Sequence, residues 1–261
     1  MAAERVSASK FGLARKCVYP WTSGLEFEKR VGWSGAIGTA GHLAAETGAL
    51  PTWEPVKIVR GKWRNADGLT KRQVEIIRGV SRQYQKWLAA NLDDMEGARH
   101  EVPLWYCPDT GECGELTRGE HRDYSKAPPG AFCMTVDLVG YGRWDFADIK
   151  TGWAPSAPDD SDQMRLIGLV ISKLRGKSEV EAGILALRER EHTFMPATLD
   201  ELTLGVVERE AKRVHLAVRN KQGPTPGDHC KWCPVRETCK ESTYGRTDER
   251  TGQAEGKSHA A

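Results

Sequence analysis

The sequence predicts an α/β fold in which helices flank a central mixed sheet. Hydrophobic residues recur at intervals of three and four from Lys71 to about Met95, a spacing that predicts an amphipathic helix. Two strand-like segments, Phe132–Val139 and Trp144–Lys150, are joined through a glycine-containing turn and predict a β-hairpin. A strand at Glu101–Tyr106 would extend this hairpin into a small antiparallel meander.

The second half of the chain mixes helical and strand patterns. We expect a helix at Asp162–Leu174, after acidic and serine residues suited to its cap, and a strand at Glu179–Leu187. Thr198 and Glu201 form a capping box that predicts a further helix running towards Val218. Together these elements would place helices around the sheet.

The composition is typical of a soluble globular protein. The chain has 261 residues, and 38 Lys and Arg against 36 Asp and Glu give a net charge of +2, which excludes a histone-like polycation. The aliphatic run Leu166–Ile171 is far shorter than a membrane span, and Met1–Lys10 has no apolar signal core. We therefore expect a cytoplasmic protein without membrane contact, with one domain over residues 1–242 and a disordered tail over 243–261.

The predicted hairpin carries the most informative charges. Side chains alternate across a strand, so Asp148 and Lys150 share one face while Ile149 points to the other. A pairing centred near the turn would bring Asp137 almost opposite Asp148. Two carboxylates at that distance repel each other, which raises a pKa or requires a cation, and a divalent metal with oxygen ligands meets that requirement. The alternative is an exposed hairpin whose charges face solvent.

Two further segments carry polar residues suited to the same site. The small-residue segment Gly38–Glu46 predicts a helix that could present His42 as a metal ligand, although a packed or surface histidine is the alternative. Gln163 falls in the first turn of the helix expected after the hairpin. Its amide could contact a phosphate or a water in the site, or it could be an ordinary surface residue.

Six residues stand in the order His42, Glu101, Asp137, Asp148, Lys150 and Gln163. This order resembles the RecB-like branch of the PD-(D/E)xK nuclease superfamily. The resemblance implies a restriction-endonuclease-like core, in which a central mixed sheet is flanked by helices. In that family a tyrosine usually follows the glutamine by four residues, whereas this chain has Ile167.

The resemblance also implies a role for each residue. The groups implied to bind Mg²⁺ or Mn²⁺ are His42, Asp137, Asp148 and the carbonyl of Ile149. Lys150 would assist the attacking water, Gln163 would contact the nucleic acid or the site water, and Glu101 would be a supporting acidic group.

Four cysteines form a second candidate site. Three lie within ten residues near the carboxyl end and one lies near the amino end: Cys230, Cys233, Cys239 and Cys17. Thiolates at this spacing can face one centre and hold tetrahedral zinc or an iron–sulfur cluster, and spacing alone does not choose between them. Reduced cysteines packed in the core are the alternative.

One cysteine before the core and three after it is similar to the iron–sulfur nucleases of AddB type and those associated with CRISPR adaptation. That resemblance implies a [4Fe–4S] cluster that joins the two ends of the fold. Cys107 and Cys113 bracket a stretch that is most simply a turn between strands.

A basic segment runs from Lys57 to Lys86, with nine basic residues against two acidic ones. Trp63 and Tyr84 lie within it, so phosphate attraction combined with base stacking could bind single-stranded nucleic acid. A solvated helix face with Tyr84 packed inward is the alternative. The residues that we assign to nucleic-acid binding are Lys62, Arg64, Arg78 and Arg82.

Together with the resemblance, these features predict a divalent-metal-dependent DNA nuclease that hydrolyses phosphodiester bonds, and the resemblance implies that it carries a structural [4Fe–4S] cluster. The resemblance implies exonuclease action on single-stranded DNA or DNA ends, alongside a helicase, a recombination protein or a CRISPR-adaptation protein. Two alternatives stay open at this point. One is a nucleic-acid-binding subunit of the same fold that does not cleave, and the other is a zinc-stapled interaction protein.

Overall fold

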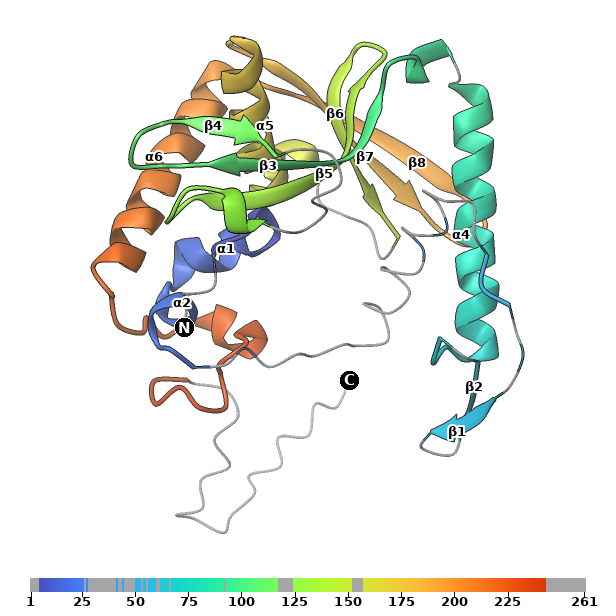
Figure 1. Ribbon diagram of the computed structural model, residues 1–261, viewed down its shortest axis with the longest axis horizontal. Helices are drawn as coiled ribbons and strands as arrows, with labels where there is room; N and C mark the ends of the chain where they lie inside the picture. Colours follow the sequence, from blue (N-terminus) through green and yellow to red (C-terminus); the bar gives the residue numbers. More distant parts are fainter. Residues whose placement is uncertain are drawn as a thin grey trace, which may run out of the picture.

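The protein is represented by a computed structural model whose centre is a six-stranded sheet in the order β4-β3-β5-β6-β7-β8 (Figure 1). The structure describes residues 5–25, 27, 41, 44, 50–52, 54, 56–59, 62–65, 67–91, 93–116, 124–151 and 157–242, with the backbone alone at 57–59, 62–64 and 141. The strands of the central sheet are β3 (Arg99–Tyr106), β4 (Cys113–Glu115), β5 (Phe132–Tyr141), β6 (Trp144–Lys150), β7 (Val180–Leu187) and β8 (His192–Leu199).

Helices and a small hairpin complete the described part. The helices are α1 (Ala8–Lys16), α2 (Tyr19–Thr22), α4 (Lys71–Ala90), α5 (Asp162–Arg175) and α6 (Glu201–Arg219). Short 3-10 turns occur at η1 (Asp93–Met95), η2 (Tyr124–Lys126), η3 (Pro158–Asp160) and η4 (Asp228–Trp232). A separate two-stranded sheet pairs β1 (Lys57–Val59) with β2 (Lys62–Arg64).

The sheet is mixed because one crossover helix interrupts a series of antiparallel pairings. Neighbouring strands run antiparallel except β6 and β7, which run parallel. Parallel neighbours need a long connection, and here α5 carries the chain from the end of β6 back to the start of β7. This crossover fixes the start of α5 beside the carboxyl end of β6.

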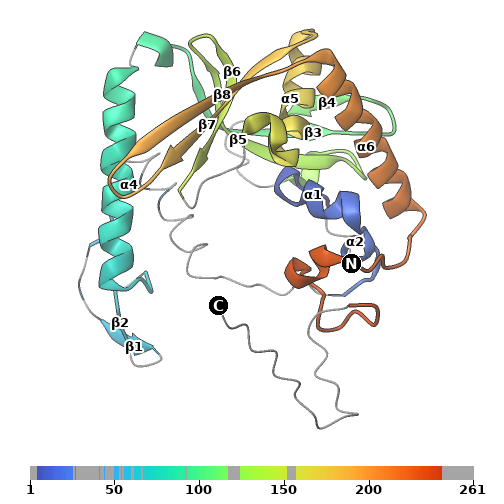
Figure 2. The same ribbon diagram turned by 180° about the vertical axis from the view of Figure 1, so that it is seen from behind.

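Helices cover both faces of the sheet (Figures 1 and 2). On one face, apolar residues of α1, α5 and α6 pack with Val136, Phe146 and Ile184 of the strands. On the other face, α4 buries Tyr84 and Trp87 against strand residues that include Leu138, Ile149 and Leu185. Burial of so much apolar surface on both sides is the main favourable term that holds the central strands in place.

The sheet changes direction at Asp137. Residues two apart on a regular strand share a face, yet Val136 packs with α5 and α6 while Leu138 packs with α4. On the neighbouring strand, Glu101 has a φ of +49°, a left-handed conformation that a residue other than glycine rarely adopts. Figure 1 shows the result, because β3 and β4 run in a different direction from β7 and β8.

The strands and helices predicted from hydrophobic patterns are confirmed, with differences at their ends. The helix predicted to reach Met95 ends at Ala90, because the side chain of Asn91 donates to the carbonyl of Trp87 at 2.7 Å and the chain leaves the helical path. The antiparallel meander is present as β3, β5 and β6. No helix in the described ranges is long and apolar enough to cross a membrane.

The capping box predicted at Thr198 and Glu201 is wrong. Thr198 belongs to β8, where its hydroxyl donates to Glu181 of β7 at 3.0 Å. Asp200 caps α6 instead, with its carboxylate accepting the backbone N–H of Thr203 at 2.8 Å. Strand β8 was not predicted because it contains Pro196, a residue that favours turns but that an edge strand can accommodate.

A buried carboxylate secures the start of β6. Asp145 is 2% exposed, and its side chain accepts hydrogen bonds from Arg175, from Lys177 at 2.7 Å and from the backbone N–H of Glu181 at 3.0 Å. Burial alone would raise the pKa of Asp145, but these three donors outweigh it and lower the pKa below its ordinary value. The ionised carboxylate therefore stabilises the turn between α5 and β7.

We expect Asp145→Asn to lower the free energy of unfolding at pH 7 by about 2 kcal/mol, after allowance for the partial exposure of both cations. A carboxylate with a lowered folded-state pKa stabilises the protein above its unfolded pKa and loses that contribution on acidification. The free energies of unfolding of parent and variant, measured in urea, should therefore begin to converge as the pH falls below about 4 and meet below the lowered folded-state pKa. A gap that stays constant down to pH 3, or an equal loss in Asp109→Asn at the surface, would contradict the prediction.

Candidate active site

Three side chains form a triangle of two hydrogen bonds and one ion pair at the end of β6. The Lys150 ammonium lies 2.7 Å from Oδ2 of Asp148 and donates to Oε1 of Gln163 at 3.1 Å. The amide nitrogen of Gln163 donates in turn to Oδ1 of Asp148 at 2.9 Å. Asp148 and Lys150 share a face as strand alternation predicts, and Ile149 between them is buried under α4. Asp148 is therefore held on both oxygens, with only 3% of the residue exposed.

Gln163 reaches this triangle because α5 begins at the right place. Ser161 caps the helix by accepting the backbone N–H of Met164, which places Gln163 in the first turn. Arg15 of α1 binds the carboxylate of Asp162 and so holds that turn from the other side. Sequence reasoning missed Arg15, because no local pattern links residues that are 147 positions apart.

Asp137 enters the site from the neighbouring strand. The pairing of β5 with β6 stops at Leu138 and Ala147, so Asp137 and Asp148 are the next residues on each strand. Beyond that point the carboxylate of Asp137 accepts the backbone N–H of Ile149 at 2.6 Å. The proximity expected from the hairpin register is thus present, and it occurs where the two strands stop pairing.

The site concentrates negative charge. Burial raises the pKa of Asp137 well above its ordinary value, and the carboxylates of Asp148 and Glu101 raise it further, against the opposing effects of the Ile149 N–H and of Lys150. Glu101 lies in register with Asp137 on β3, between the pairs His100–Leu138 and Val102–Val136. A cation placed among these oxygens would relieve the repulsion, so the donor set suits a hard divalent metal.

His42 lies outside the described residues, whereas the preceding residue, Gly41, is described. A Cβ added to Gly41 would lie 3.2 Å from the side chain of Thr151, so the backbone there runs close to the end of β6. Ala44 is buried in a small cluster with Leu69 and with Ile77 of α4. Within the described ranges, no three Cys, His, Asp or Glu side chains are arranged to hold a metal ion.

The four cysteines predicted as ligands line one narrow cavity. Cys17 follows α1, and the other three come from η4 and the loop after it, which lies beside α2 in both ribbon views (Figures 1 and 2). Burial raises the pKa of the Cys233 thiol, and the other three sulfurs raise it further against a backbone N–H at Val235. The fold therefore brings together thiols from opposite ends of the described chain.

Cys107 and Cys113 do not form a comparable pair. Cys113 pairs with Tyr106 across the β3–β4 hairpin, Cys107 is the first residue after β3, and neither lines the cavity of the four cysteines. The predicted turn between strands is confirmed, with the Cys107 N–H donating to the Glu112 carbonyl at 2.8 Å.

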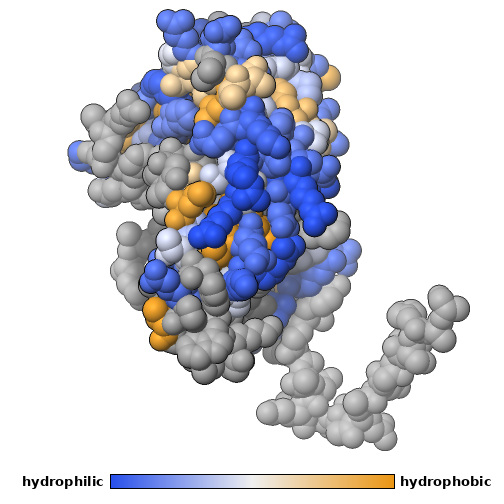
Figure 3. All heavy atoms as spheres, turned by 90° about the vertical axis from the view of Figure 1, so that its right-hand side faces the viewer, coloured by the Kyte–Doolittle hydropathy of each residue, from blue (hydrophilic) through white to orange (hydrophobic). Residues whose placement is uncertain are grey.

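The basic segment is only partly available to a ligand. Arg78 is half-buried and donates to the carbonyl of Pro51 at 3.1 Å, and Tyr84 is packed in the core, so its proposed stacking on bases is wrong. Arg82 and Lys86 are exposed on α4 and have no ion-pair partner in the described ranges. Figure 3 shows the hydrophilic column that this outer face of α4 presents. The side chains of Lys62 and Arg64 lie outside those described.

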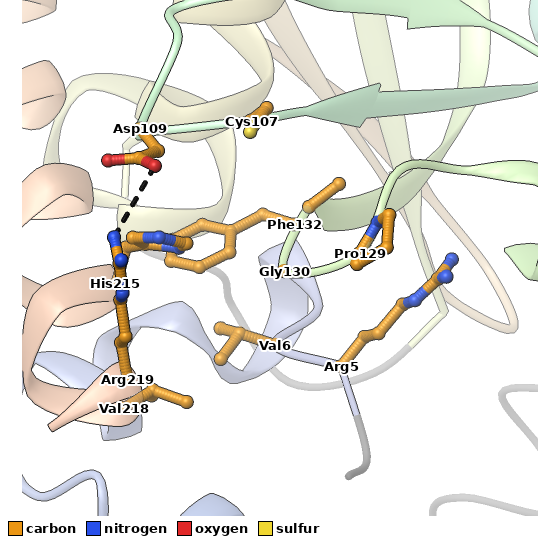
Figure 4. Close-up of a pocket in the computed structure, with 11 residues that line it drawn as sticks. Arg5, Val6, Cys107, Asp109, Pro129, Gly130, Phe132, His215, Val218 and Arg219 are labelled. Carbon is orange, nitrogen blue, oxygen red and sulfur yellow. Dashed lines mark ion pairs between the residues drawn. The ribbon is translucent and has the colours of Figure 1, made fainter. Parts of the chain in front are cut away.

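A cavity of about 670 Å³ lies at the far end of β5 from the carboxylates. Figure 4 shows Asp109 facing Arg219, with 3.6 Å between the charged atoms, while Arg5 points away from them. None of the residues predicted for the active site lines this cavity.

Ile167, at the position where the family has tyrosine, is fully buried and cannot contact a ligand.

Comparison with known proteins gives one finding. The sequence model of the PD-(D/E)XK nuclease superfamily matches residues 5–240, which include both the carboxylate site and the four cysteines. No curated protein sequence matches the chain.

We expect Asp137→Asn to stabilise the metal-free protein at neutral pH, because the substitution removes a charge that burial and Asp148 disfavour. A carboxyl with a raised folded-state pKa destabilises the protein once the pH exceeds its unfolded pKa, so the gain should grow from pH 4 to pH 8. Urea unfolding in EDTA at both pH values would measure it. A variant less stable than the parent at pH 8 would contradict the electrostatic account.

Proposed function

The chain belongs to the PD-(D/E)XK nuclease superfamily, and from that premise we propose that it is a divalent-metal-dependent DNA nuclease of the RecB-like iron–sulfur branch. The six-stranded mixed sheet flanked by helices fits the restriction-endonuclease-like fold of that superfamily. The observation that carries the proposal is the meeting of Asp137, Asp148 and Lys150 where two strands part.

The residues proposed to hold Mg²⁺ or Mn²⁺ are His42, Asp137, Asp148 and the carbonyl of Ile149. The bound ion would polarise the phosphate and lower the pKa of a water, which is the usual contribution of a metal to phosphodiester hydrolysis. The raised pKa of Asp137 supports this assignment, since a cation would favour the ionised carboxylate.

The remaining residues position the reactants. Lys150 is proposed to orient the attacking water, and its contact with Gln163 fixes the ammonium at the mouth of the site, where the side chain is 35% exposed. Gln163 also holds Asp148, so we assign it a positioning role rather than a contact with nucleic acid. Glu101 is proposed as a supporting acid that adds to the negative charge beside Asp137.

DNA is the proposed substrate, with exonuclease action on ends or single strands inferred from the resemblance to the RecB-like branch. Exposed Arg82, together with Lys86, supports phosphate binding along α4. Lys62, Arg64 and Arg78 are kept as proposed contributors, although Arg78 already has a backbone partner. A helicase, recombination or CRISPR-adaptation protein is the proposed partner class.

A [4Fe–4S] cluster is the proposed occupant of the cysteine cavity. Four thiols from two distant segments line it. Four thiols suit a [4Fe–4S] cluster, and the resemblance to iron–sulfur nucleases favours the cluster over a zinc ion. Residues 1–242 are the proposed domain, and the tail proposed for 243–261 lies outside the described residues.

We expect Asp148→Ala to reduce cleavage of end-labelled single- and double-stranded DNA by orders of magnitude with Mg²⁺ or Mn²⁺, because a metal ligand is lost. Lys150→Ala should also abolish cleavage while still taking up the metal. DNA affinity should survive in both, since phosphate attraction comes from Lys and Arg elsewhere. Asp93→Ala, at an exposed position on η1, is the matched control and should cleave like the parent. Parental rates in both site variants would refute the proposed active site.

We expect anaerobically purified protein to be brown and to contain about four irons per chain. Alanine substitution of any one of the four proposed cluster ligands should lower the iron content and the Tm. These ligands are Cys17, Cys230, Cys233 and Cys239. Cys107→Ala and Cys113→Ala should keep the iron, because neither thiol lines the cavity. Stoichiometric zinc without iron would overturn the cluster assignment. The cleavage assay would still test the proposed active site independently.

A further inference from the structure

His229 is a buried histidine that shares the cavity of the four cysteines. It precedes Cys230 in the sequence, is only 8% exposed and lines the same cavity as Cys17 and Cys233. Its Nε2 atom is shielded from solvent and has no hydrogen-bond partner in the part of the chain that the structure describes. Neither the predicted ligand set nor the proposed reaction gives this side chain a role.

The local sequence folds the ring inward. The N–H of Cys230 donates to the carbonyl of Gly227 at 2.9 Å, which closes a turn with His229 inside it. A Cβ added to Gly227 would lie 3.0 Å from Nδ1 of His229, closer than nearly all real contacts. Glycine at this position therefore leaves the space that the imidazole occupies.

A second donor at the same cavity has no acceptor. Arg236 lines the cavity, and its Nε is also buried without a hydrogen-bond partner among the described residues. A buried donor without a partner destabilises the fold, so two of them at one cavity indicate that an acceptor belongs there. A cluster held by four thiolates is negatively charged and exposes sulfur acceptors on every side.

We propose that Nε2–H of His229 donates a hydrogen bond to a sulfur of the cluster and thereby raises its reduction potential. The inference rests on the proposed [4Fe–4S] cluster and deepens it. Hydrogen bonds to sulfur stabilise the reduced cluster more than the oxidised one, because reduction adds negative charge. His229 is a donor here and not a ligand, since the four thiolates complete the coordination of four irons.

The test compares three variants of the full chain purified without oxygen. His229→Leu removes the donor at similar volume, and His229→Gln keeps an N–H donor. His215→Leu removes a half-buried histidine from the separate cavity of Figure 4 and serves as the matched control. Iron content, the midpoint potential of the cluster and the Fe–S stretching frequencies from resonance Raman spectra are measured for each variant.

We expect His229→Leu to keep the parental iron content while its midpoint potential becomes more negative and its Fe–S stretches move to higher frequency. His229→Gln should fall between parent and His229→Leu, and His215→Leu should match the parent. The Raman spectrum is recorded on the oxidised cluster, so it decides the matter even if the cluster resists reduction. If His229→Leu does not fold, His229→Gln must still show a shift in frequency towards higher values.

Three results would overturn the proposal. Unchanged frequencies in the His229 variants would show that Nε2 does not touch the cluster. Loss of iron in folded His229→Leu, as in a cysteine variant, would make His229 a ligand. A parent protein without iron would remove the cluster itself, whereas its DNA cleavage would still report separately on the proposed nuclease activity.

Discussion

Repulsion between two carboxylates on adjacent strands is the constraint around which this protein is built. Asp137 and Asp148 stand at the first positions beyond the last pair of the β5–β6 ladder. Several otherwise separate features converge on them: the left-handed backbone at Glu101, the backbone N–H of Ile149 and the start of α5. Ile149 and α5 supply hydrogen-bond donors to the two carboxylates, and the left-handed backbone at Glu101 departs from the conformation of a regular strand. The apolar contacts on both faces of the sheet offset the cost of keeping these charges together.

The local parts of this arrangement could be predicted from the sequence. Strand alternation put Asp148 and Lys150 on one face, and the hairpin register put Asp137 near them. The contacts between residues far apart in the sequence could not be predicted. Nothing near Asp162 in the sequence indicates that Arg15 will bind it, and the twist that sends Val136 and Leu138 to different faces depends on the neighbouring strand. Thr198 and Asp200 are both good capping residues, and the pairing of β8 with β7 decided between them.

Counting basic residues in the sequence overestimates the charge available to DNA. Arg72 is bound by both oxygens of Glu189, and Arg78 by a backbone carbonyl. A guanidinium that already has such partners must give them up before it can bind a phosphate, so its net contribution to affinity is small. Arg82 and Lys86 lack such partners among the described residues and can bind without that loss.

The docking of α1 has a consequence for the order in which the protein folds. Arg15 contacts Asp162 and Glu210, and Arg213 donates to the carbonyl of Arg15 at 2.8 Å. These contacts join residues that are between 147 and 198 positions apart in the sequence, and contacts so distant in sequence slow folding. Because α1 holds the helix that carries Gln163, the triangle of Asp148, Lys150 and Gln163 is completed only after these distant segments have met.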